Sequence, residues 1–95
     1  MVSIRWLGHA SVEVRCDETI IYCDPWIQGN PACPIKLSDI SRADAICVTH
    51  GHFDHLGDSI ELAKTTKAPL ICSPEIGHYV NKHGITYGEG SNPLN

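Results

Sequence analysis

The stretch Ala45-Ile46-Cys47-Val48-Thr49-His50-Gly51-His52-Phe53-Asp54-His55 passes from an apolar run directly into three histidines and an aspartate. The unbroken apolar run 45–48 is typical of a strand that is buried on both faces of a parallel sheet. The residues at 56–60 predict a loop that enters a helix. Polar side chains at the carboxyl end of such a strand lie where open α/β sheets place their chemistry. The stretch therefore predicts an α/β fold and the location of its site.

Before this stretch, apolar and polar residues alternate over 2–7 and 11–16. The alternation predicts two strands that are joined by Gly8-His9-Ala10 into a β-hairpin with one solvent-facing side. A third strand is expected over 19–23, ending at Asp24. A long irregular loop rich in proline and glycine would follow it.

After the histidine run, a second apolar run at 70–72 predicts another buried parallel strand. Between the two runs, Asp58 is expected to cap a helix, with Glu61 completing a capping box. The apolar face of that helix would consist of Leu56, Ile60 and Ala63.

Ser73-Pro74-Glu75 predicts the start of a second helix, because proline is favoured at the first helical position. Gly84 would end this helix, and its apolar side would be formed by Ile76, Tyr79, Val80 and His83. With a short last strand over 85–87, the prediction is an α/β domain over 1–95, a β-hairpin followed by βαβαβ. Two helices cover only one face of this sheet, so the other apolar face is expected to be exposed or covered by a partner.

The composition, 42% hydrophobic and 19% charged, suits a soluble globular protein. A formal net charge of −4 argues against nucleic acid or an anionic membrane as partner. No apolar stretch approaches transmembrane length, and the first residues do not resemble a signal peptide. The five cysteines include no Cys-x-x-Cys, and we interpret Cys23, Cys47 and Cys72 as small hydrophobic residues. Together these features predict a reducing, cytoplasmic location.

Imidazoles and carboxylates are the usual ligands of zinc and similar ions. One residue separates His50 from His52, so both side chains would point the same way if the strand continued. Asp54 and His55 would approach a second ion from the side. Two neighbouring metal ions can share a hydroxide, and metal binding lowers the pKa of such a water to about 7. The motif therefore predicts a metal site.

His50-x-His52-x-Asp54-His55 after an apolar strand resembles the signature of the metallo-β-lactamase superfamily. Three further segments resemble a branch of cytosolic, mostly uncharacterised metal-dependent hydrolases related to ascorbate-6-phosphate lactonase: Trp6-Leu7-Gly8-His9-Ala10, Asp24-Pro25 with Gly29-Asn30-Pro31, and Leu56-Gly57-Asp58. The resemblance extends from residue 2 to about residue 88. It implies the N-terminal half of an αββα sandwich.

The resemblance also implies residue roles. The metal ligands would be His50 and His52 for the first ion, and Asp54 and His55 for the second. Asp54 would in addition orient the attacking water or hydroxide. Asp24 would support the ligands from behind, and His9 would lie on the substrate side of the site. Considered without the family, His9 is better explained as a surface turn residue, and Asp24 as an ordinary end of a strand.

Members of this superfamily take another histidine, a metal-bridging aspartate and a final histidine from their second half. The sequence ends at Asn95 without these motifs, so a truncated domain is expected, and His78 and His83 lie in no matching motif. Each metal position then has two side-chain ligands, whereas catalytic zinc normally has three.

Two functional hypotheses follow. In the first, the protein is a metal-dependent hydrolase whose metal-bound hydroxide attacks an ester, lactone or phosphodiester of a small-molecule substrate. In the second, it is a non-catalytic metal-binding or interaction module with an incomplete site. Up to two ions are expected, zinc first, with manganese and iron also suited to mixed ligands. A homodimer or another partner would cover the exposed sheet face.

Overall fold

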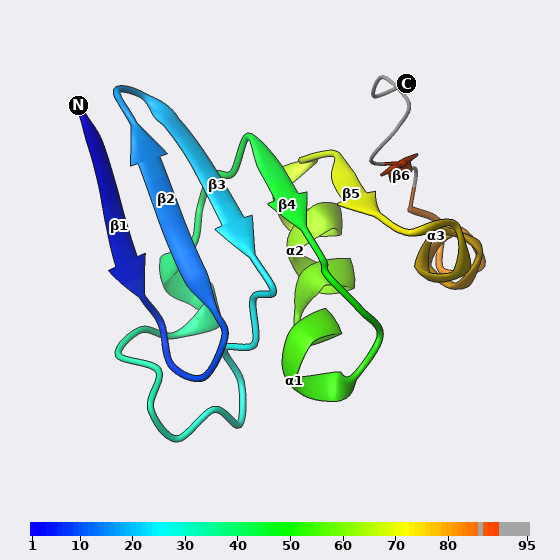
Figure 1. The fold of residues 1–95 in the computed structure, drawn as a ribbon, viewed down its shortest axis with the longest axis horizontal. Helices are drawn as coiled ribbons and strands as arrows, with labels where there is room; N and C mark the ends of the chain where they lie inside the picture. The colour runs from blue at the N-terminus through cyan, green and yellow to red at the C-terminus, as the bar shows by residue number, and fades with distance from the viewer. Residues whose placement is uncertain (86, 90–95) are drawn as a thin grey trace.

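The computed structural model describes residues 1–85 and 87–89. In chain order, its elements are β1 (Val2–Trp6), β2 (Val12–Cys16), β3 (Thr19–Cys23), the short 3-10 helix η1 (Leu37–Asp39), β4 (Ala45–Cys47), α1 (Phe53–Leu56), α2 (Ser59–Thr66), β5 (Leu70–Cys72), α3 (Pro74–Asn81) and β6 (Tyr87–Glu89). The strands form one sheet in sequence order (Figure 1). Pairing is antiparallel from β1 to β3 and parallel from β3 to β6.

The predicted hairpin followed by βαβαβ is thus confirmed. The last strand lies at 87–89 rather than at 85–87, and residue 86 falls outside the described residues. Ile85 is instead buried below α3, where its N–H donates to the carbonyl of Val80 at 3.2 Å.

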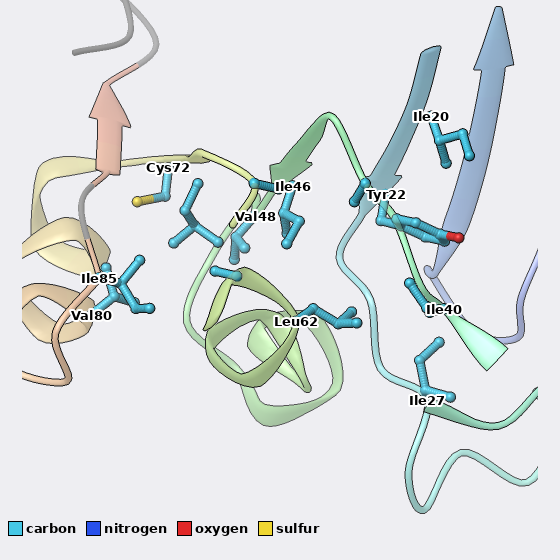
Figure 2. Close-up of a cluster of buried hydrophobic side chains, with 14 of the residues drawn as sticks. Ile20, Tyr22, Ile27, Ile40, Ile46, Val48, Leu62, Cys72, Val80 and Ile85 are labelled. Atoms are coloured by element: carbon cyan, nitrogen blue, oxygen red, sulfur yellow. The ribbon is translucent and has the colours of Figure 1, made fainter. Parts of the chain in front are cut away.

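The hydrophobic core lies between the sheet and its helices (Figure 2). Strand alternation places these buried side chains on the helix-covered face of β3, β4 and β5: Ile20, Tyr22, Ile46, Leu70 and Cys72. Leu62 of α2 and Val80 of α3, 1% and 0% exposed, pack into the same cluster. Each such burial contributes about 1.5–3 kcal/mol, so the core fixes the position of β4, which carries the histidine run.

The opposite face of the sheet retains access to solvent. Val2, Ile4 and Trp6 of β1 are 58%, 71% and 62% exposed. The strand register continues this apolar surface from Ile4 across Val14 and Ile21, which are half-buried. The expectation that the hairpin would have only one wet side is therefore wrong for β1, which is exposed along its whole length. The physical reason is its position at the sheet edge, away from the helices (Figure 1).

The first helical region differs from the prediction. A short helix, α1, already begins at Phe53, and Gly57 separates it from α2. Asp58 precedes α2, but its side chain makes no capping hydrogen bond, so the predicted capping box is wrong. Its carboxylate accepts hydrogen bonds from the N–H groups of Ile27 and Gln28 instead, at 2.6 and 2.9 Å.

The break at Gly57 also changes which side chains of α2 are buried. The predicted apolar face, which includes Leu56, assumes one continuous helix. In the structure Ser59, Leu62 and Ala63 are buried, whereas Leu56 and Ile60 are only half-buried.

The second predicted helix begins as expected. The Ser73 hydroxyl accepts a hydrogen bond from the N–H of Ile76 at 3.4 Å, and proline occupies the first turn. Ile76 and Val80 are buried. Tyr79 is 50% exposed and its ring contacts that of the exposed His83, so the predicted apolar stripe was too wide.

Cys23 and Cys47 are register partners in β3 and β4, and both thiols are half-buried. Burial raises the pKa of the Cys47 thiol to about 11. The group therefore stays protonated at neutral pH and packs as a small hydrophobic side chain, as predicted. Among the described residues, no helix has both the length and the apolar character required to cross a membrane.

Candidate metal centre

The predicted ligands lie between β4 and α2, at the carboxyl end of a parallel strand. β4 ends at Cys47, so strand geometry does not extend to His50. His52 immediately precedes α1, and Asp54 and His55 lie within that helix. The short helix α1, which the sequence pattern did not predict, brings the ring of His55 back beside that of His50.

The ring of His50 lies nearest the centre of this group. Its centroid is 4.7 Å from that of His52 and 3.8 Å from that of His55. The Nε2 atom of His55 is 3.7 Å from Oδ2 of Asp54. The closest pair of rings, His50 and His55, thus joins the two ligand pairs that the resemblance implied.

Among residues 1–85 and 87–89, no three His, Cys, Asp or Glu side chains are arranged to hold a metal ion. The donor set itself, imidazoles beside a carboxylate, fits zinc, manganese or iron. The chemistry of these donors therefore fits a divalent ion, although no three of the described side chains are grouped as one ion would require.

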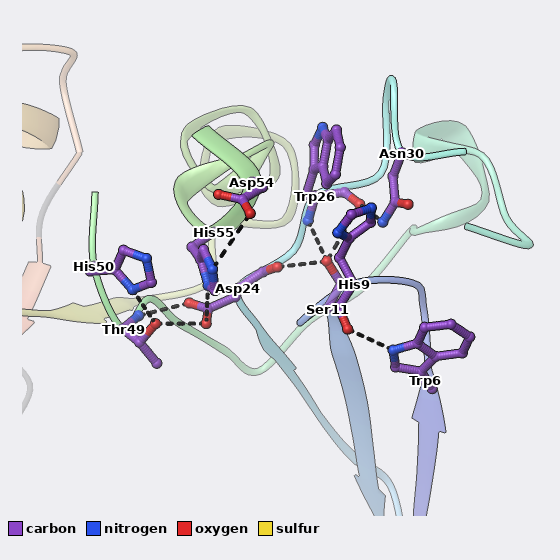
Figure 3. Close-up of polar contacts among 10 residues, drawn as sticks. All are labelled: Trp6, His9, Ser11, Asp24, Trp26, Asn30, Thr49, His50, Asp54 and His55. Carbon is purple, nitrogen blue, oxygen red and sulfur yellow. Dashed lines mark hydrogen bonds and ion pairs between the residues drawn. The ribbon is translucent and has the colours of Figure 1, made fainter. Parts of the chain in front are cut away.

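Asp24 connects the end of β3 to the ligand run. Its side chain is buried, and its carboxylate accepts hydrogen bonds from the N–H and the hydroxyl of Thr49, each at 2.7 Å (Figure 3). Oδ2 of Asp24 is also 3.0 Å from Nδ1 of His55. Because an ionised carboxylate only accepts, Nδ1 of His55 carries the proton and Nε2 keeps its lone pair. This is the arrangement in which a carboxylate orients a metal-binding histidine.

Buried polar contacts hold the loop that follows Asp24. The Ser11 hydroxyl donates to the carbonyl of Asp24 at 2.7 Å and accepts from the N–H of Trp26 at 2.8 Å. The Asn30 amide donates to the carbonyl of Trp26 at 2.9 Å. These contacts fix the backbone on the far side of Asp24 from the ligands.

Sequence reasoning did not identify Thr49 or Ser11 as parts of the site. For Thr49 a signal was available, because this residue lies between the buried strand and the first predicted ligand. Ser11 gave no such signal, since a serine in an alternating strand is usually solvent-facing, whereas here it is fully buried.

His9 lies in the hairpin turn with a positive φ of 52°. Its ring contacts that of Trp26 at 4.9 Å between centroids, and Trp26 contacts Phe53 at 5.4 Å. His9 is thus connected to the ligand run through Trp26. Its assignment to the substrate side stays a prediction.

A cleft of about 750 Å³ opens between the ligand run and α3. Its lining combines apolar and polar side chains: Thr49, His50, Phe53, Leu56, Ser73, Glu75, Ile76 and Tyr79, with Gly51 and Gly57. The volume falls within the range of small-molecule sites. His50 is the predicted ligand that faces this cleft.

Fold and site together define an α/β protein with a candidate metal centre at the carboxyl end of its parallel strands. The sequence model of the metallo-beta-lactamase superfamily matches residues 29–92 of the chain. The chain belongs to this superfamily.

Curated relatives agree with this assignment. Proteins described as "UPF0173 metal-dependent hydrolase" from Koribacter versatilis and Methanobrevibacter smithii are 44% and 45% identical over 85 residues. Each alignment covers 88% of this chain, but 36% and 35% of the relative. The chain thus spans about a third of the length of these relatives, and the predicted resemblance to metal-dependent hydrolases is confirmed.

Solved structures show the same fold. Igni18, a metallo hydrolase from Ignicoccus hospitalis, has a TM-score of 0.85 and 30% identity, covering 94% of this chain and 39% of that one. CmlA, a diiron beta-hydroxylase from Streptomyces venezuelae, has a TM-score of 0.69 and 21% identity over 99% of this chain and 22% of its own. The CmlA match shows similarity of fold alone.

Proposed function

We propose that the chain carries the first part of a metal-dependent hydrolase site, with His50, His52, Asp54 and His55 as metal ligands. The observation that carries this proposal is the contact of Asp24 with His55. Because Nδ1 carries the proton, the lone pair of Nε2 of His55 is available to bind a metal ion. This Nε2 atom lies 3.7 Å from the carboxylate of Asp54. A histidine held in this way by a buried carboxylate is typical of metal centres.

The chemistry that we propose is hydrolysis of an ester, lactone or phosphodiester. A bound divalent ion supplies a Lewis acid and lowers the pKa of water to about 7. Asp54 would orient the attacking water, and Asp24 would keep His55 in the required tautomer. The cleft beside His50 would receive a small-molecule substrate, with Phe53 and Ile76 contacting its apolar part.

Zinc is our first choice of metal, and manganese and iron are the alternatives. Mixed imidazole and carboxylate ligands suit all three. A neighbour of similar fold, CmlA, is described as a diiron enzyme. We propose up to two ions for the complete site.

A second candidate is a metal-binding or interaction module without turnover. The observation that favours it is the absence, among the described residues, of three grouped donors. Two ligands for each ion hold metal more weakly than the three of a catalytic zinc site.

An activity measurement separates the two candidates. The chain is loaded with Zn²⁺, Mn²⁺ or Fe²⁺ and assayed with a generic phosphodiester and a lactone. For the hydrolase we expect turnover that falls by about 100-fold or more in Asp54→Ala, because a positioned carboxylate contributes at least that factor. Glu18→Ala removes an exposed carboxylate far from the site and serves as the control.

Bound metal without turnover of either substrate would support the module instead. Equal turnover by the native chain and Asp54→Ala would rule out the proposed role of Asp54.

A further inference from the structure

The Thr49 hydroxyl lies between the buried carboxylate of Asp24 and the ring of His50. Its Oγ1 is 2.7 Å from Oδ2 of Asp24 and 3.0 Å from Nδ1 of His50 (Figure 3). We propose that Thr49 is a positioning residue that fixes the tautomer of His50, so that Nε2 is the atom offered to a metal ion. This inference rests on the proposed function in one respect, the assignment of His50 as a ligand.

The direction of each hydrogen bond follows from the groups involved. An ionised carboxylate only accepts, so the Thr49 N–H donates to Oδ1 of Asp24 and the Thr49 hydroxyl donates to Oδ2. A hydroxyl has one proton, and here that proton is donated to Asp24. The hydroxyl can therefore only accept a hydrogen bond from His50. The Nδ1 atom of His50 must therefore carry a proton, and the lone pair of the neutral ring is then on Nε2.

The same carboxylate oxygen thus determines the tautomers of two histidines. Oδ2 of Asp24 accepts from His55 directly and controls His50 through the Thr49 hydroxyl. The two rings lie 3.8 Å apart between centroids, and both present Nε2 as the unprotonated nitrogen. The Thr49 hydroxyl is needed to fix the tautomer of His50, whereas the tautomer of His55 does not depend on this hydroxyl.

This difference provides the test. The ring nitrogens of His50 and His55 are read by ¹⁵N–¹H correlation NMR in the metal-free chain, at a pH where both rings are neutral. In the native chain we expect both histidines as the Nδ1–H tautomer. In Thr49→Val, which keeps the side-chain shape without the hydroxyl, His50 should shift to a mixture with the Nε2–H form. His55 should be unchanged and thus serves as the internal control.

Thr49→Ser retains a hydroxyl and should restore the native tautomer of His50. A zinc titration gives the second readout: Thr49→Val should weaken zinc binding by about tenfold or more, and Thr49→Ser should not. Retention of the Nδ1–H tautomer by His50 in a folded Thr49→Val would overturn the proposal.

An Nε2–H tautomer of His50 in the native chain would overturn it as well, and this result does not depend on whether any variant folds. The hydrolase assay could show no turnover while the NMR spectra show the expected tautomers of His50 and His55. That result would contradict the proposed function but would support the role of Thr49. The two inferences therefore fail by different measurements.

Discussion

Glu13 is a charged residue in the interior of the sheet, at 3% exposure. Its carboxylate accepts hydrogen bonds from Arg5 on β1 and Arg15 on β2, each at 3.1 Å, and from the Tyr22 hydroxyl on β3 at 2.9 Å. Burial by itself raises the pKa of Glu13, but the hydrogen bonds from Arg15 and Tyr22 and the nearby arginine charges outweigh it, so the pKa is lowered. This single side chain therefore links three strands and favours its charged form.

The lowered pKa of Glu13 predicts a pH dependence. A carboxyl group whose pKa is lower in the folded than in the unfolded chain stabilises the fold above the unfolded pKa. The contribution is lost as the pH falls through the folded pKa. Glu13→Gln should therefore lower the free energy of unfolding by about 1–3 kcal/mol at pH 7, and the difference from the native chain should shrink below about pH 4.

Urea unfolding at several pH values measures this difference, with Glu18→Gln at an exposed position as the control. A gap between Glu13→Gln and the native chain that is constant from pH 7 to pH 3 would contradict the assignment.

At the scale of elements, sequence patterns identified the first five strands and both main helices, but placed the last strand at 85–87 instead of 87–89. The prediction was wrong where a side chain that could have bonded locally bonds to residues far away in the sequence. The Asp58 carboxylate bonds to the backbone of Ile27 and Gln28, about 30 positions away, instead of capping α2. The contacts of Asp24 with Thr49 and His55 are equally remote in sequence, so spacing alone did not reveal them.

Gly57 is the boundary between α1, which carries Asp54 and His55, and α2. Its φ of 47° and ψ of −122° form a combination that glycine adopts far more readily than other residues. A Cβ atom there would lie 2.5 Å from the carbonyl oxygen of Pro25, directly after Asp24. Gly57→Ala should therefore destabilise the chain by about 2 kcal/mol or more and displace the ligand run.

Gly84 provides the matched control, because its φ is also positive, at 82°, but a Cβ there meets no atom of the described residues within 4 Å. Gly84→Ala should cost only the conformational strain, about 1 kcal/mol. Equal losses of unfolding free energy in thermal melts of the two variants would show that the contact with Pro25 is unimportant.

At the scale of the whole molecule, the sheet has one face packed against helices and one face open to solvent. The sequence predicted this asymmetry from the number of helices, since two helices cannot cover both faces of a sheet. It could not predict what covers the second face, because the covering residues are not encoded in the strands themselves. The apolar side chains of β1 are exposed on this face, and an exposed apolar patch is where association is expected.

We expect this face to drive association of the isolated chain. Ile4 is 71% exposed on the open face, and its neighbour Ser3 is exposed on the opposite side of β1. Ile4→Lys should reduce association in sedimentation velocity experiments, because a charge placed within the apolar face is costly to bury in a contact. Ser3→Lys adds the same charge to the other face and should have little effect. Similar sedimentation of both variants and the native chain would count against the open face as the contact.

We propose that His50, His52, Asp54 and His55 hold a divalent metal ion, and we would compare zinc binding by the native chain with that by the double variant His50→Ala, His52→Ala. We predict saturable binding to the native chain and at least about tenfold weaker binding to the double variant. His78→Ala, His83→Ala removes the same number of imidazoles outside the site and should bind zinc as the native chain does. Equal zinc affinity of the native chain and the double variant at positions 50 and 52 would show that these two histidines do not bind the ion.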